Sequence, residues 1–284
     1  MTISNQPQID LWDGRVGEKW AAMQVSLDAM LANATVELVS RVGDVTGQRL
    51  LDIGCGNGET CVIWAQGAAE VTGVDVSSPM LAVAAKRVQE MGQKAKGQGH
   101  VELIKADASA WVSERAFDLA VSQFGVMFFS DPALAFKTIA ANLRPGGRFV
   151  FTCWRHLDEN QWVTLPMGTI SDLLPVTSAP VPHAPGPFAL ADKERLKGLL
   201  ERAGFSHIKM TPFDCPVCVA TEGGVDVASR FVMQIGPTSV ALAEADKPTK
   251  VIAQERLKTA LLPYEKNGCV NLGGAIWVVE SVRA

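Results

Sequence analysis

The sequence lacks three features that would point to membranes or nucleic acids. No run of apolar residues approaches the roughly 18 that a membrane-spanning helix needs, so we expect no membrane insertion. The first residues, MTISNQPQID, have neither a basic segment nor an apolar core, so no secretory signal is predicted and a cytoplasmic location is expected. The 26 Lys and Arg residues are scattered and the net charge is -4, which argues against a nucleic-acid partner.

The sequence also lacks a cysteine pattern with an obvious role. Its six cysteines are spread over the whole chain, and reduced, partly buried thiols are the simplest interpretation. Cys215 and Cys218 form a CxxC pair, but they lie in a predicted strand, where residues three apart point to opposite faces. Because no second pair of ligands accompanies them, we predict no metal site.

Strand and helix patterns alternate over the first half of the chain. Apolar residues at helical spacing predict one or two helices within residues 17–42. From about residue 48 to 154, five short apolar strands alternate with helices, which is typical of βαβ units and a parallel sheet. We therefore expect an α/β fold with a doubly wound, mostly parallel sheet.

The regular alternation ends after the fifth predicted strand. A proline-rich connection over residues 175–187 contains too many helix and strand breakers to be regular. The remaining patterns predict helices at 162–174 and 191–204, a sixth strand at 207–220, a helical insertion at 221–268 and a last strand at 273–282.

The strongest local pattern is a glycine-rich turn, LLDIGCGNGE, after the first predicted strand. Gly54, Gly56 and Gly58 alternate where side chains would stop the backbone from turning sharply and lying against a ligand. In doubly wound sheets, ligands bind outside the carboxyl ends of the strands at such a turn. A tight turn that needs glycine for packing alone is the alternative interpretation.

An acidic residue, Asp75, ends the second predicted strand, VTGVDV. Its carboxylate could accept hydrogen bonds from the vicinal hydroxyls of a ribose, or it could simply cap the next helix. The glycine turn about 20 residues upstream favours the ribose. The spacing is GxGxG, whereas the dinucleotide fingerprint GxGxxG would need its third glycine at Glu59.

Four motifs occur together in this order: DIGCGNG at 52–58, Asp75, ADA at 106–108 and LRPGG at 143–147. The set closely resembles class I S-adenosylmethionine-dependent methyltransferases over residues 45–155. Within that superfamily, the run FDLAVSQFGVMFFSDP resembles the ubiquinone- and menaquinone-biosynthesis C-methyltransferase branch. The resemblance implies a Rossmann-like, seven-stranded sheet with an antiparallel last strand and a helical lid.

The resemblance also implies S-adenosylmethionine as cofactor and S-adenosylhomocysteine as product. Asp75 would bind the ribose hydroxyls and Asp107 the adenine amino group, while Trp12 would cover the cofactor. Trp20, at helical spacing, is better interpreted as a core residue. The full set of implied cofactor-binding residues is Asp52, Gly54, Cys55, Gly56, Gly58, Asp75, Val76, Met80, Asp107, Ala108, Ser122, Gln123, Phe124 and Trp12.

Methyl transfer from a sulfonium is an in-line displacement that orientation and a dry pocket can accelerate without an obligatory metal. If the acceptor is a hydroxyl or a carbon acid, a base is needed, and His156 is the catalytic candidate, although a lone loop histidine is usually solvated. Arg155 could instead bind an acidic acceptor. Apolar side chains near the expected mouth favour a flat or aliphatic acceptor, and the predicted substrate-binding residues are Met127, Phe128, Trp154, Arg155 and Trp162.

We therefore expect an enzyme that methylates a small, largely apolar or aromatic molecule at carbon, oxygen or nitrogen. A nicotinamide-dependent oxidoreductase and a non-catalytic S-adenosylmethionine-binding regulatory protein are the alternatives, and a homodimer stays open. The expected organisation is a single domain over 1–284, with N-terminal helices in 1–44, a cofactor-binding core in 45–155 and lid insertions in 156–190 and 221–268.

Overall fold

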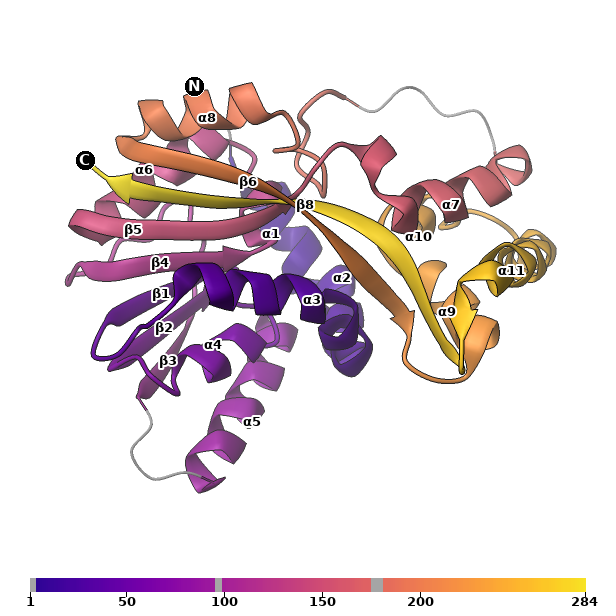
Figure 1. Ribbon diagram of the computed structural model, residues 1–284, viewed down its shortest axis with the longest axis horizontal. Coiled ribbons are helices and arrows are strands. Elements are labelled where there is room, and N and C mark those ends of the chain that lie inside the picture. Colours follow the sequence, from indigo (N-terminus) through magenta and orange to yellow (C-terminus); the bar gives the residue numbers. More distant parts are fainter. Residues whose placement is uncertain (1–3, 95–98, 175–180) are drawn as a thin grey trace.

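The computed structural model describes residues 4–94, 99–174 and 181–284 (Figure 1). Part of the predicted proline-rich connection, 175–180, lies outside these residues. The strands are β1 Arg49–Ile53, β2 Glu70–Asp75, β3 His100–Lys105, β4 Phe117–Gln123, β5 Leu143–Trp154, β6 Phe205–Ala220, β7 Glu265–Lys266 and β8 Cys269–Arg283. The α-helices are α1 Gln6–Asp13, α2 Arg15–Ala22, α3 Gln24–Val42, α4 Glu59–Trp64, α5 Ser78–Lys94, α6 Pro132–Asn142, α7 Gln161–Ile170, α8 Lys193–Arg202, α9 Gly224–Val232, α10 Gly236–Ala241 and α11 Lys247–Leu261.

The strands form a sheet in the order β3-β2-β1-β4-β5-β8-β6, and the short β7 pairs with β8. β1 pairs in parallel with both β2 and β4, so the chain moves away from β1 in opposite directions. β8 is antiparallel to its neighbours β5 and β6. The predicted α/β class, mostly parallel sheet and antiparallel last strand are confirmed. β7 is an additional strand within the segment predicted to be a helical insertion.

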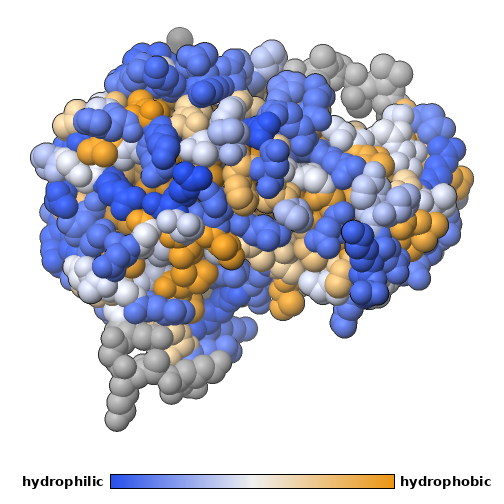
Figure 2. Space-filling view, in the orientation of Figure 1, coloured by the Kyte–Doolittle hydropathy of each residue, from blue (hydrophilic) through white to orange (hydrophobic). Residues whose placement is uncertain are grey.

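The central strands are buried on both faces, as a parallel sheet between two layers of helices requires. On one face, Leu50 and Leu119 pack with Trp64 of α4. On the other face, Leu51 and Phe149 pack in a cluster that includes residues of α6 and α8. Figure 1 shows α3, α4 and α5 on one side of the sheet. On the face drawn in Figure 2, hydrophilic side chains predominate and hydrophobic ones form small patches between them.

β6 and β8 are much longer than the central strands and extend beyond them (Figure 1). The inserted helices gather at this extension: α9 packs on β6, α7 packs on β8, and α11 contacts both α7 and α9. The two segments predicted as separate insertions therefore pack against each other at one end of the sheet.

Three helices precede β1 where the sequence pattern predicts one or two. α1 begins at Gln6, ahead of the predicted helical region, with Pro7 in its first turn. Proline suits that position because the first N–H groups of a helix have no partner within it. None of the described helices combines the length and the apolar character needed to span a membrane.

Candidate active site

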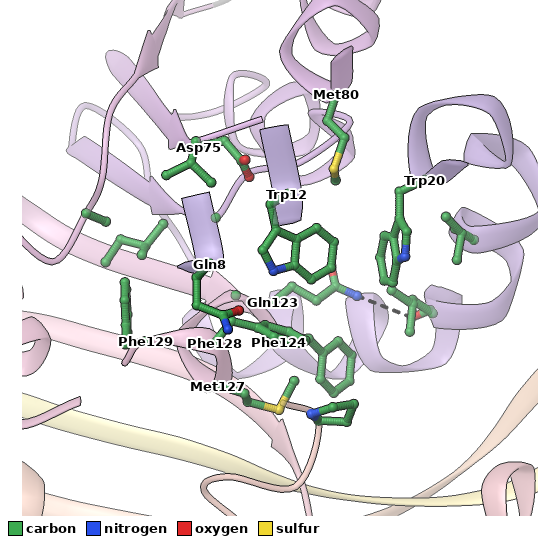
Figure 3. A pocket seen from close by; sticks show the side chains of 18 of the residues that line it. Gln8, Trp12, Trp20, Asp75, Met80, Gln123, Phe124, Met127, Phe128 and Phe129 are labelled. Atoms are coloured by element: carbon green, nitrogen blue, oxygen red, sulfur yellow. Dashed lines mark hydrogen bonds between the residues drawn. The ribbon is translucent and has the colours of Figure 1, made fainter. Parts of the chain in front are cut away.

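A cavity lies at the carboxyl ends of the central strands, where the connections on either side of β1 diverge. On the β2 and β3 side it has a polar end, defined by Asn5, Gln8, Asp75 and Asp107. On the β4 and β5 side it has an aromatic end, defined by Phe124, Met127, Trp154 and Trp162. In the view of Figure 3, Asp75 and Met80 lie on one side of Trp12, and Phe124 and Met127 lie on the other.

The two ends of the cavity meet where the loops after β1 and β4 cross. Gly54 has a left-handed backbone (φ 66°), and a Cβ atom there would lie 2.9 Å from the Cα atom of Gly125. Only glycine fits this crossing without moving the backbone. Gly58 has another role, because a Cβ atom there would lie 2.6 Å from the Cβ atom of Ala84 on α5. The glycine turn thus serves both the cavity and helix packing.

Asp75 is held in a fixed orientation by the backbone around it. Its Oδ2 accepts a hydrogen bond from the Gly56 N–H and its Oδ1 accepts one from the Ser77 N–H, each at 2.8 Å. Burial raises the pKa of Asp75, while these N–H donors act in the opposite direction. A carboxylate oxygen has two lone pairs, so Asp75 can still accept hydrogen bonds from a ligand in the cavity.

Asp107, after β3, is the second carboxylate of the polar end. Its Oδ1 accepts hydrogen bonds from Asn5 Nδ2 and from the Ser109 N–H, both at 2.9 Å. Its Oδ2 accepts one from the Ser109 hydroxyl at 2.8 Å. Asp107 therefore connects the loop after β3 to the residue that precedes α1.

α1 covers the polar end and is fixed near both of its termini. At its start, Asn5 binds Asp107 and also accepts a hydrogen bond from the Ser130 N–H at 3.1 Å. At its end, Asp13 accepts hydrogen bonds from the Ser78 N–H at 2.7 Å and from Lys105 Nζ at 2.6 Å. The hydrogen bond from Lys105, supported by that from Ser78, lowers the pKa of Asp13 to about 2. The helix is thus pinned to the loops after β2, β3 and β4.

Two side chains of α1 bring unpaired polar atoms to the cavity. The Oε1 atom of Gln8 and the Nε1 atom of Trp12 are buried, and neither has a hydrogen-bond partner in the described part of the chain. Leaving such groups without partners is unfavourable, by about 1–3 kcal/mol for each. A polar ligand bound beside Asp75 would supply partners to both atoms.

The aromatic end is a series of packed rings. Phe124 has a left-handed backbone (φ 60°), and its ring stacks on that of Trp154, with 4.5 Å between centroids and an interplanar angle of 16°. The ring of Trp162 lies 4.9 Å from that of Trp154. The Nε1 atom of Trp162 donates to Asn160 Oδ1 at 3.2 Å, so its only polar atom is satisfied. This wall therefore presents ring surfaces to a ligand.

Several predicted cofactor-binding residues lie beneath the cavity and do not line it. Asp52 is buried under the glycine turn, where its Oδ2 accepts hydrogen bonds from Thr60 Oγ1 at 2.5 Å and Cys61 Sγ at 3.4 Å. Burial raises the pKa of Asp52 to about 6. Ser122 donates to the Ile53 carbonyl oxygen at 2.7 Å, which fastens β4 to the end of β1. Cys55 is buried in the core on the same side as Trp64. Gly56 and Gly58 also lie outside the lining.

Arg155 and His156 also lie outside the cavity lining. Arg155 forms ion pairs with Asp214 and Glu159, and its guanidinium lies over the Trp277 ring. The side chain of His156 is 70% exposed and lies 3.3 Å from Asp158. At these positions, neither side chain faces a molecule bound in the cavity.

The structure brings the other predicted site residues together. Those that line the cavity are Trp12, Gly54, Asp75, Val76, Met80, Asp107, Ala108, Gln123, Phe124, Met127, Phe128, Trp154 and Trp162. Sequence reasoning did not identify Asn5, Gln8 or Gly236 as lining residues, and it interpreted Trp20, which also lines the cavity, as a core residue. For the first two a signal was present, because Asn5 followed by Pro7 is typical of a helix start. No comparable pattern marks Gly236.

Comparison with known proteins agrees with this geometry. A family model described as a methyltransferase domain matches residues 51–151. A ubiquinone biosynthesis O-methyltransferase of Aromatoleum aromaticum is 32% identical over 143 residues, which cover 49% of this chain and 58% of that protein. A malonyl-acyl-carrier-protein O-methyltransferase of Pseudescherichia vulneris is 31% identical over 134 residues, or 46% and 49% of the two chains.

The fold is also found in solved structures. Phosphoethanolamine N-methyltransferase 2 of Haemonchus contortus, crystallised with S-adenosyl-L-methionine, aligns with a TM-score of 0.56 and 20% identity, over 99% of this chain and 60% of that chain. The chain spans about half the length of the curated relatives that it matches. The matched segment includes the glycine turn, Asp75 and Asp107, and over residues 51–151 this chain is similar to the methyltransferase domain family.

Proposed function

We propose that this protein transfers the methyl group of S-adenosylmethionine to a small, largely apolar or aromatic acceptor. The observation that supports this most strongly is the continuity of the cavity, in which the polar end and the aromatic end meet at Gly54 and Gly125. A polar, charged cofactor suits the first end and an apolar ring suits the second. The methyl group would then lie near the crossing of the two loops.

The residues of the polar end fit an adenosine group. Asp75 would accept hydrogen bonds from the ribose hydroxyls, and Asp107 would accept one from the adenine amino group. Val76 and Met80 offer apolar contacts for the adenine ring. The unpaired Oε1 atom of Gln8 and Nε1 atom of Trp12 would gain partners on the cofactor. When bound, S-adenosylmethionine supplies an electrophilic methyl group on a sulfonium.

The chain would accelerate the transfer mainly by orientation and by excluding water. Backbone N–H groups fix the carboxylates of Asp75 and Asp107, which would hold the adenosine group in one position. The Phe124 and Trp154 rings keep the acceptor in an apolar environment, where a nucleophile loses its water shell. His156 has no part in this proposal, because its side chain is exposed outside the cavity.

We further propose that the inserted segments form the acceptor side of a single domain. Trp162 of α7 and Gly236 at the start of α10 both line the aromatic end. They come from the first and second insertions, and a Cβ atom on Gly236 would lie 2.8 Å from the Trp162 ring. The contact between the two insertions therefore limits the size of acceptor that fits.

A calorimetric titration with S-adenosylmethionine and S-adenosylhomocysteine tests the proposed function. We expect both to bind the wild type, and Asp75→Ala to weaken both by about 100-fold, since two hydrogen bonds to a charged group contribute roughly 1.5 kcal/mol each. Asp118→Ala is the matched control. Asp118 is the second residue of β4, at the end of the strands opposite the cavity, where it accepts hydrogen bonds from the Arg49 N–H and from Arg144 Nε. A wild type that binds neither ligand would overturn the proposal, and nicotinamide nucleotides would be titrated next.

A further inference from the structure

The side chain of Gln123 is a polar group on the aromatic side of the cavity. It is the last residue of β4, immediately before Phe124, and it lines the cavity. Figure 3 shows its amide among the cavity-lining side chains, with a hydrogen bond marked. Because Phe124 and Trp154 offer only ring surfaces nearby, the direction of this amide decides which polar group can bind beside the rings.

Contacts with α3 fix the direction of the Gln123 amide. Its Nε2 atom donates to Thr35 Oγ1 at 2.8 Å and to the Leu31 carbonyl oxygen at 3.4 Å. The Thr35 hydroxyl donates its own hydrogen to the same carbonyl at 3.2 Å, so its oxygen can only accept from Gln123. Both partners on α3 are thus acceptors, and only the NH2 group of the amide can face them.

The Oε1 atom of Gln123 is therefore directed away from α3. Within the described residues no group donates a hydrogen bond to it, and it is not among the buried unpaired atoms. Since the residue lines the cavity, this oxygen is accessible from there. A carbonyl oxygen at this position attracts O–H and N–H groups and repels the oxygens of a carboxylate or a phosphate.

We propose, on the basis of the proposed methyl transfer, that Gln123 selects an uncharged ring compound that carries a hydroxyl or N–H group. The ring packs on Phe124 and Trp154, and its O–H or N–H donates to Gln123 Oε1. This contact is one of recognition, so the bound group keeps its hydrogen. Thr35 is a positioning residue, because its hydroxyl keeps the amide in the orientation that presents Oε1.

The test compares three probes that differ in one substituent: naphthalene, 2-naphthol and 2-naphthoate. Their affinities are measured by calorimetry in the presence of saturating S-adenosylhomocysteine. We expect 2-naphthol to bind about three- to tenfold more tightly than naphthalene, as one neutral hydrogen bond provides, and 2-naphthoate to bind most weakly. Equal affinities of 2-naphthol and naphthalene, tighter binding of 2-naphthoate, or no binding of any probe would overturn the proposal.

Two variants link this preference to Gln123 and Thr35. Gln123→Leu should abolish the preference for 2-naphthol, whereas Gln66→Leu, on the exposed turn after α4, should keep it. Thr35→Val removes the hydroxyl and should reduce the preference for 2-naphthol, whereas Thr35→Ser retains the hydroxyl and should keep that preference. Both substitutions change the side chain at the same buried position. Loss of S-adenosylmethionine binding in Gln123→Leu would assign this side chain to the cofactor and contradict the proposal. Failure of the wild type to bind S-adenosylmethionine would instead count against the proposed function.

Discussion

The polar end and the aromatic end of the cavity are assembled in different ways. Asp75 is the last residue of β2 and Asp107 follows β3 by two residues, and N–H groups from the loops after β1, β2 and β3 orient them. The aromatic end combines the ends of β4 and β5 with residues of α7 and α10. Contacts that suit the cofactor are therefore local to short motifs, whereas contacts that suit the acceptor depend on how distant segments pack. The first can be preserved while the second changes.

The largest effect should follow when a carboxylate of the polar end is removed. Asp107→Ala is expected to weaken S-adenosylmethionine binding by about 100-fold. The substitution removes the carboxylate that would bind the adenine amino group, and it also removes the hydrogen bond from Asn5 that anchors α1. Each hydrogen bond to a charged group contributes roughly 1.5–3 kcal/mol. Asn5→Ala removes the anchor alone and should weaken binding about three- to tenfold. Calorimetry distinguishes the two roles. Equal losses in the two variants would show that the anchor, not the adenine contact, controls affinity.

Beneath the polar end lies Asp52, a buried carboxyl group whose ionisation is unfavourable. Burial raises the pKa of Asp52 to about 6, above its value in the unfolded chain, so the folded state holds this proton more tightly. The free energy of unfolding should therefore fall as the pH rises from about 4 to about 6, by at most about 3 kcal/mol, and then level off. Asp52→Asn should remove this part of the pH dependence. Thermal unfolding from pH 4 to 7 measures it, and an unchanged slope in the variant would assign the effect to other groups.

At the aromatic end, Trp162→Leu should weaken 2-naphthol binding about tenfold through lost ring contact and leave S-adenosylmethionine affinity unchanged. The substitution should also cost about 2–4 kcal/mol of stability, as core truncations do. Trp64→Leu is the matched control, because Trp64 is buried on the other face of the sheet. It should lose similar stability and bind 2-naphthol normally. A parallel loss of cofactor binding in Trp162→Leu would mean that the two ends are not independent.

The smallest effect is expected at His156. His156→Ala should change the methylation rate of any accepted substrate by less than about twofold, because exposed residues away from the site contribute little. The pH profile of the rate should also keep its shape. A tenfold loss of rate with unchanged ligand affinities would show that the loop after β5 moves into the cavity during the reaction.

The sheet and the polar end were accessible to sequence reasoning because their signals are contiguous. The motif at 52–58 and Asp75 lie at the carboxyl ends of predicted strands, and parallel strands bring these ends to the same side of the sheet. What a motif does not give is the direction of each side chain. Ser122 and Gln123 are adjacent, yet Ser122 binds the end of β1 and Gln123 lines the cavity, since neighbours in a strand point to opposite faces.

The rest of the site depends on tertiary packing. Gly236 meets Trp162 only because the two insertions fold against each other, and neither segment carries a pattern that indicates the other. Trp12 was expected to cover the cofactor, but the helix α1 that carries it was not predicted, because its position over the cavity comes from specific hydrogen bonds of Asn5 and Asp13. Such contacts become visible only in three dimensions.

The crowding of indole rings around the cavity has a practical, spectroscopic consequence. Trp12, Trp20, Trp154 and Trp162 all line it, in a chain with seven tryptophans and a single tyrosine. Trp12 and Trp20 lie 5.4 Å apart, beside the position expected for an adenine ring. Intrinsic emission of the unlabelled protein should therefore respond when either half of the cavity fills. The pair near α1 would report the nucleoside, and the pair near α7 would report the acceptor.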